Sequence, residues 1–136
     1  MDQDQIAVMK ECNSLSLAGK ISFPQVVGKL REIGVERYHA DFSRQEKTYY
    51  MPEGQTHIES LGKLPEPTAE RFSAAGVESA IREIQRGEIN YLDFLRKIMG
   101  AGCVGYFVQI TGRCALYFGR NGEVHRELFP SAPKAN

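Results

Sequence analysis

The chain contains two similar stretches of sequence, and this repeat constrains the fold more than any other feature. When residues 21–59 are aligned without gaps on residues 89–127, an offset of 68, eight of 39 positions are identical. Ordinary composition would give roughly two or three identities by chance. The identical pairs are Ile21/Ile89, Lys29/Lys97, Gly34/Gly102, Tyr38/Tyr106, Tyr49/Tyr117, Gly54/Gly122, His57/His125 and Glu59/Glu127. The sequence therefore predicts one structural unit that is used twice.

Each copy has the pattern of two helices followed by three strands. In the first copy, Ser22 is suited to cap a helix with an apolar stripe, and Gly34 is suited to end it. Asn90 and Gly102 hold the same places in the second copy. Amphipathic segments over residues 5–17 and 73–86 precede these helices, and strand-like runs follow at 35–42 and 103–110, at 47–51 and 115–119, and near each repeated histidine.

Neither half is expected to bury its apolar residues alone, because each would leave one face of a small sheet uncovered. We therefore predict a single α+β domain over residues 1–130, an internally duplicated α-α-β-β-β unit in two repeats at about 5–60 and 73–128. The strands of both repeats would form one antiparallel sheet with the helices packed on one face. Residues 131–136 are predicted to form a flexible tail.

Charge and cysteine content exclude several partner classes. Lys plus Arg equals Asp plus Glu at 17 each, without long runs of one sign, so we expect no nucleic-acid partner. We expect no membrane partner either, because the longest uncharged run, 98–112, is too short to span a bilayer. The acidic start of the sequence predicts a cytoplasmic location. Three cysteines without metal-ligand spacing predict reduced thiols and no zinc site.

Alternation along the predicted strands divides their side chains between a face under the helices and a free face. The apolar pattern places Tyr38, Ala40, Tyr106 and Val108 under the helices, and by the same argument Thr48, Tyr50, Leu116 and Phe118. The predicted free face holds the candidate binding residues His39, Asp41, Tyr49, Phe107, Gln109 and Tyr117, joined by His57 and His125. Such an aromatic surface is typical of a partner interface, an oligomer contact or a ligand groove. This pairing implies a three-residue hairpin loop, and a two-residue Gly112-Arg113 turn would reverse the second strand.

Two motifs that resemble ligand-binding loops have simpler explanations. GAGCVG at residues 100–105 matches the dinucleotide-binding pattern, but it ends a helix and opens a strand, the reverse of what a pyrophosphate site needs. GEINYLDFLRKIM is similar to the second half of an EF-hand, yet the positions for side-chain oxygens hold Arg82, Ile84 and Arg86. We therefore expect no calcium and no cofactor.

The sharpest chemical hypothesis concerns four residues of the first copy. His39 and Asp41 share one face of a strand, and so do His57 and Glu59. If the two pairs converged, they would suit a divalent metal or acid–base catalysis. The competing interpretation is an ordinary solvated strand face, which we favour. Nucleophile, phosphate-loop and metalloprotease signatures are absent from the sequence, so we assign no catalytic and no metal residues and favour a non-enzymatic role.

Several segments, in this order, also resemble a known family. They are FPQVVGKL, GVERYHAD, TYYMPEGQ, GEI, GCVGY and YFGRNGEVHRELFP, and they extend over almost the whole chain. They are similar to the YbcV-like family of bacterial and prophage proteins, a domain of unknown function. The resemblance implies a bacterial or prophage origin and carries over no catalytic or binding residue. Some members are labelled as phage envelope proteins, which is the only ground for a phage structural role.

These observations lead to two main functional hypotheses. The first is a binding module whose free sheet face engages a protein partner, a second copy of the chain or a small ligand. The alternative is a small metal-dependent or acid–base enzyme that uses His39, Asp41, His57 and Glu59.

Overall fold

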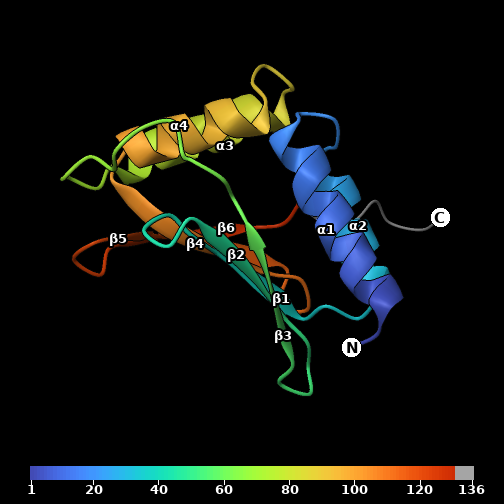
Figure 1. The fold of residues 1–136 in the computed structure, drawn as a ribbon. Coiled ribbons are helices and arrows are strands. Elements are labelled where there is room, and N and C mark those ends of the chain that lie inside the picture. The colour runs from blue at the N-terminus through green and yellow to red at the C-terminus, as the bar shows by residue number, and fades with distance from the viewer. Residues whose placement is uncertain (131–136) are drawn as a thin grey trace.

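The computed structural model describes residues 1–130, so the predicted flexible tail at 131–136 lies outside the described residues. Four helices and six strands form an α+β domain (Figure 1). The helices are α1 (Gln3–Leu17), α2 (Phe23–Glu32), α3 (Ala74–Gln85) and α4 (Tyr91–Gly100). The strands are β1 (Arg37–Asp41), β2 (Glu46–Tyr50), β3 (Thr56–Ser60), β4 (Cys103–Gln109), β5 (Cys114–Gly119) and β6 (Val124–Leu128). The predicted fold class is confirmed.

All six strands form one antiparallel sheet in the order β3-β2-β1-β4-β5-β6. Its centre is the β1–β4 pair, in which His39 lies directly opposite Phe107, the residue 68 positions later. Shifting α2 and β3 by 68 residues reproduces the bounds of α4 and β6. The two halves of the chain thus have the same element order and meet along the middle of the sheet; duplication as their origin stays a hypothesis.

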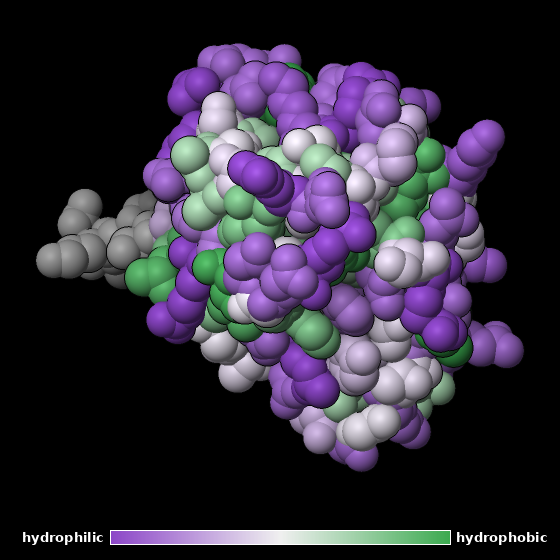
Figure 2. Space-filling model, turned by 90° about the vertical axis from the view of Figure 1, so that its left-hand side faces the viewer, coloured by the Kyte–Doolittle hydropathy of each residue, from purple (hydrophilic) through white to green (hydrophobic). Residues whose placement is uncertain are grey.

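The helices lie on one face of the sheet and leave the opposite face uncovered (Figure 1). Their apolar stripes meet the inward side chains of the strands, and Leu30, Leu95 and Ile98 are fully buried there. On the side of the molecule shown in Figure 2, hydrophilic side chains gather at the top, over α3 and α4, with hydrophobic ones interspersed below. The buried residues of α3 and α4, by contrast, belong to the apolar stripes that the helical periodicity predicts.

Local signals explain where the repeated helices begin and end. Ser22 and Asn90 each accept a hydrogen bond from the backbone N–H three residues on, in capping boxes with Gln25 and Asp93. A further capping box at Asp2 starts α1 two residues earlier than the sequence pattern suggested. Each such cap contributes about 1 kcal/mol to helix stability. Gly34, at φ 87°, follows α2 in a left-handed conformation that a glycine adopts without strain.

The two central hairpins have four-residue loops rather than the three-residue loops that the sequence assignment assumed. Asp41 pairs with Glu46 in the first hairpin, and Gln109 pairs with Cys114 in the second. The Asp41 carboxylate accepts hydrogen bonds from two backbone N–H groups within the first loop, which is a typical turn role for aspartate. The longer loops shift the register of β2 and β5 by one residue, and this reverses their faces.

Two further properties of the described residues bear on function. None of the helices within residues 1–130 has both the length and the apolar character needed to cross a membrane. Cys12, Cys103 and Cys114 are unpaired, in agreement with the predicted reduced thiols, and all three are buried.

Candidate functional site

The uncovered face of the sheet, here called the open face, presents three rows of residues with one from each strand. In sheet order from β3 to β6, the first row is Thr56, Tyr50, Arg37, Gln109, Cys114 and Leu128. The second is Ile58, Thr48, His39, Phe107, Leu116 and Arg126. The third is Ser60, Glu46, Asp41, Gly105, Phe118 and Val124.

The two halves of the open face differ in chemistry. Strands β1 to β3 contribute mostly charged and hydroxyl-bearing side chains, whereas β4 to β6 contribute six apolar ones and a single charge, Arg126. The six are Phe107, Cys114, Leu116, Phe118, Val124 and Leu128, here called the apolar patch. Val124 is 50% exposed and Leu128 is 61% exposed. Half of this sheet face is therefore hydrophobic. Val124 and Leu128 on β6 are exposed, Phe107, Leu116 and Phe118 are half-buried, and Cys114 is buried.

An aromatic stack joins the two halves of the open face. The His39 ring lies parallel to the Phe107 ring at a centroid distance of 4.3 Å and an angle of 8°. Phe107 also contacts Phe118 edge-on at 6.1 Å, and the Arg37 guanidinium lies 4.3 Å from the centre of the Tyr50 ring. Burial lowers the pKa of His39 from its ordinary value, although the Asp41 charge opposes this shift. His39 is therefore mainly neutral near pH 7 and acts as a flat packing surface.

The structure places four of the eight predicted site residues on the open face: His39, Asp41, Phe107 and Gln109. The placement of the other four, Tyr49, Tyr117, His57 and His125, was wrong. They lie on the helix side, with Tyr49 only 1% exposed and Tyr117 only 7% exposed. The cause is the four-residue loop in each central hairpin. The open face holds instead three residues that the sequence assignment put under the helices: Tyr50, Leu116 and Phe118.

The hypothetical four-residue chemical site does not assemble. His39 and Asp41 lie on the open face, whereas His57 and Glu59 lie on the helix side beside Tyr49 and Lys47. His57 Nε2 instead contacts Glu59 Oε2 at 2.5 Å within its own strand. Across residues 1–130, no three His, Cys, Asp or Glu side chains form a group that could hold a metal ion.

A matching pair occurs at the opposite edge of the sheet. His125 Nε2 lies 3.3 Å from Glu127 Oε1, and Arg82 of α3 donates to Glu127 Oε2 at 2.8 Å. The hydrogen bonds from Arg82 and His125 lower the pKa of Glu127 below its ordinary value, although partial burial acts in the opposite direction. Because this pair is tied to a helix, it connects α3 to the sheet edge.

A buried lysine on the helix side was missed by the sequence reasoning. Lys47 is only 3% exposed, and its ammonium lies 5.2 Å from the centre of the Tyr38 ring and 4.9 Å from that of Tyr91. Burial lowers its pKa to about 8. The corresponding position in the second half is Ala115, and this difference in the aligned strands was the available signal. Because the ammonium is buried between two aromatic rings, we do not count Lys47 among the binding residues, and the desolvation of its charge is a cost to folding.

Comparison with known proteins gives a family without an assigned activity. The model of the DUF1398 family, described as a protein of unknown function, matches residues 22–127, from the start of α2 to the end of the sheet. The chain belongs to this family. No curated protein matches the chain. The DUF1398 match agrees with the predicted domain of unknown function, while the YbcV-like name and the bacterial or prophage origin stay predictions.

Proposed function

We propose that this DUF1398 protein is a non-enzymatic binding module, and that the apolar patch binds the same patch on a second copy of the chain. The observation that carries the proposal is the hydrophobic half of the open face, where Leu128 is 61% exposed and Val124 is 50% exposed. Two sheets that face each other with apolar side chains between them form a well-known packing arrangement.

Charge supports a second copy as the partner. The formal net charge is zero, so two copies do not repel each other through their overall charge. A two-fold axis that runs along β5 would set β4 of one copy against β6 of the other. Arg126 would then meet the partner's Phe107 ring, a favourable cation–aromatic contact. Asp41 and Glu46 would stay outside the contact, because they lie on β1 and β2.

The size of the patch sets the expected affinity. Three strands of five residues cover roughly 14 Å by 17 Å. A footprint of roughly 240 Å² on each copy is below the area of stable specific interfaces, so we expect a weak, reversible dimer with a dissociation constant of roughly 100 μM or weaker.

Sedimentation velocity over a wide range of protein concentration tests the proposal. The natural chain should pass from monomer to dimer, and Val124→Lys should weaken the dimer by roughly tenfold or more, since it buries a charge. Ile58→Lys is the matched control, because Ile58 is also 50% exposed and lies on the open face of the other edge strand. A natural chain that stays monomeric, or a Val124→Lys chain that dimerises normally, would overturn the proposal.

The enzymatic alternative is not proposed, because its four residues lie on opposite faces of the sheet. The bacterial or prophage origin is supported by the resemblance to the YbcV-like family. The cytoplasmic location is supported by the three unpaired thiols, which fit a reducing compartment.

A further inference from the structure

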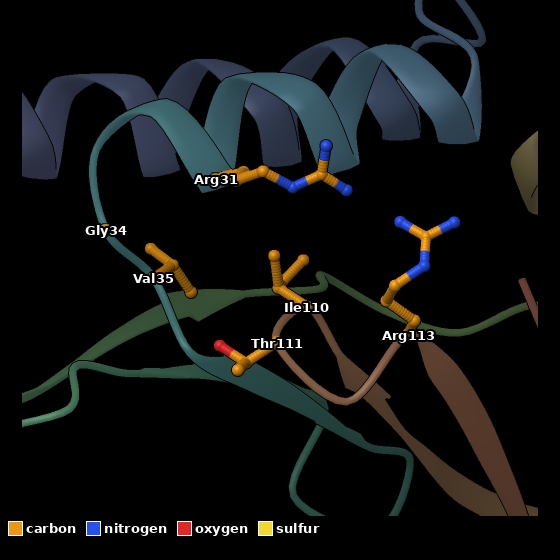
Figure 3. Close-up of a pocket in the computed structure, with 6 residues that line it drawn as sticks. All are labelled: Arg31, Gly34, Val35, Ile110, Thr111 and Arg113. Carbon is orange, nitrogen blue, oxygen red and sulfur yellow. The ribbon is translucent and has the colours of Figure 1, made fainter. Parts of the chain in front are cut away.

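A pocket of about 310 Å³ lies between the end of α2 and the β4–β5 loop (Figure 3). It is lined by Arg31, Gly34, Val35, Ile110, Thr111 and Arg113. The guanidinium groups of Arg31 and Arg113 extend into the same space above an apolar floor (Figure 3). Arg113 also donates a hydrogen bond from Nη2 to Pro130 O at 3.2 Å, and its guanidinium lies 5.8 Å from the centre of the Phe129 ring. Neither arginine forms a salt bridge to a carboxylate within residues 1–130. The pocket therefore offers two positive charges without a counterion among the described residues.

The other half of the molecule has a scaffold of the same construction at the positions 68 residues away. Ile110 N donates to Glu36 O at 2.9 Å, and Phe42 N donates to Val104 O at 3.1 Å. Phe129 N donates to Arg113 O, as Leu61 N donates to Gln45 O. The φ angles also agree, at 87° for Gly34 and 85° for Gly102, and at 57° for both Arg113 and Gln45. The two surroundings are therefore built alike.

In the second half, the chain itself fills this scaffold. Residues 64–72 run along the end of α4, where Leu64 is buried and Ala69 N donates to Met99 O at 2.9 Å. A Cβ atom at Gly102 would lie 2.2 Å from the backbone oxygen of Arg71. At Gly34, by contrast, the nearest atom to such a Cβ is Met51 Cε, at 3.8 Å. The space that an extended segment occupies beside Gly102 is thus open beside Gly34.

We propose that the Arg31–Arg113 pocket binds an extended peptide segment of another protein that carries a carboxylate. The backbone of that segment would run along the end of α2 as residues 64–72 run along α4. Arg31 O, which accepts from Gly34 N, would take a second hydrogen bond, as Met99 O accepts from both Gly102 N and Ala69 N. Arg31 stands in the place of Met99, and Arg113 stands in the place of Gln45. These two exchanges place guanidinium groups at two positions where the scaffold beside Gly102 has uncharged side chains, and guanidinium groups bind a carboxylate with paired hydrogen bonds. This site is separate from the open face, so it does not depend on the proposed dimer.

Fluorescence anisotropy with a labelled peptide tests the site on the full chain. The probe is the sequence of residues 63–73, KLPEPTAERFS, which fills the corresponding scaffold and carries Glu66 and Glu70. Saturable binding is expected, and Arg31→Gln and Arg113→Gln should each weaken it by roughly three- to tenfold. Replacing both glutamates of the peptide by glutamine should weaken binding in the same way. Arg44→Gln is the control, since Arg44 is an exposed arginine on the β1–β2 loop and should leave binding unchanged.

Three other outcomes would overturn the proposal. The first is the absence of binding to the natural chain. The second is binding that survives both arginine substitutions in proteins whose NMR spectra show the native fold. The third is binding that appears only when residues 131–136 are replaced by a glycine and serine sequence of the same length. That result would assign the pocket to the chain's own last residues rather than to another protein. The open-face variant Val124→Lys should bind the peptide normally, which separates this test from that of the dimer.

Discussion

Replacing the buried Lys47 by methionine should stabilise the protein near neutral pH. Methionine has nearly the same length, so it fills the same space between the tyrosine rings without the charge. Burial lowers the pKa of Lys47 from 10.5 to about 8, a difference of about 2.5 pKa units. At 1.36 kcal/mol for each unit, this corresponds to about 3 kcal/mol of unfolding free energy.

The direction of the pH dependence follows from the lowered pKa. Below about pH 8, folded and unfolded chains both carry the proton, and the folded state bears the cost of the buried charge. Between about pH 8 and 10.5, the unfolded chain binds more protons than the folded chain, so stability rises with pH. The natural chain should therefore gain free energy of unfolding between about pH 7.5 and 9. Above this range the gain is opposed by the thiols of Cys12 and Cys103, whose pKa values burial raises, and then by the buried tyrosines, because these groups ionise first in the unfolded chain.

Urea denaturation at several pH values measures this effect. Lys47→Met should be more stable than the natural chain by up to about 3 kcal/mol near pH 7, and the difference should shrink as pH rises. Lys20→Met serves as the control, because Lys20 is exposed and should contribute less than about 0.5 kcal/mol. A Lys47→Met chain that is less stable by more than about 1 kcal/mol at every pH would refute the reasoning, and would show that the contacts of the ammonium with the rings outweigh its desolvation.

Two pairs of substitutions test the packing that the two sites rest on, both by chemical denaturation. Gly102→Ala should lower the free energy of unfolding by more than about 3 kcal/mol, because its Cβ would collide with the Arg71 backbone. Gly34→Ala should lower it by about 1 kcal/mol, from its left-handed backbone alone, and equal losses would contradict an open space beside Gly34. Because only Tyr49 is fully buried, Tyr49→Ala should lower the free energy of unfolding by about 3–5 kcal/mol and Tyr50→Ala by about 1 kcal/mol. A larger loss for Tyr50→Ala than for Tyr49→Ala would contradict the observed strand register.

The fold was accessible from the sequence because its local signals agree with one another. Ser22 and Asn90 are good capping residues, apolar residues recur at helical spacing after them, and a glycine stands at each helix end. The β1 and β4 strands could also be assigned to the correct faces. Tyr38 and Ala40 alternate with the polar His39 and Asp41, which fixes the direction of each side chain.

The sequence did not determine which residues of β2 and β5 lie on the open face, because these strands carry bulky residues on both faces. Leu116, Tyr117 and Phe118 are all hydrophobic, so alternation alone allows either orientation. The length of the hairpin loop decides between them, and the left-handed conformation of Arg113 that permits four residues is not typical of arginine. Lys47 was missed for a related reason, since a lysine in a strand is normally assigned to the solvent side.

NMR chemical shifts of the natural chain on dilution test the central claim, the binding of one apolar patch to another, most directly. Self-association predicts concentration-dependent shifts that cluster on β4 to β6, at Phe107, Leu116 and Val124, and leave Ile58 on β3 unchanged. Shifts that cluster on the helices, or spectra that do not change from low to high concentration, would contradict a binding role for the open face toward a second copy of the chain.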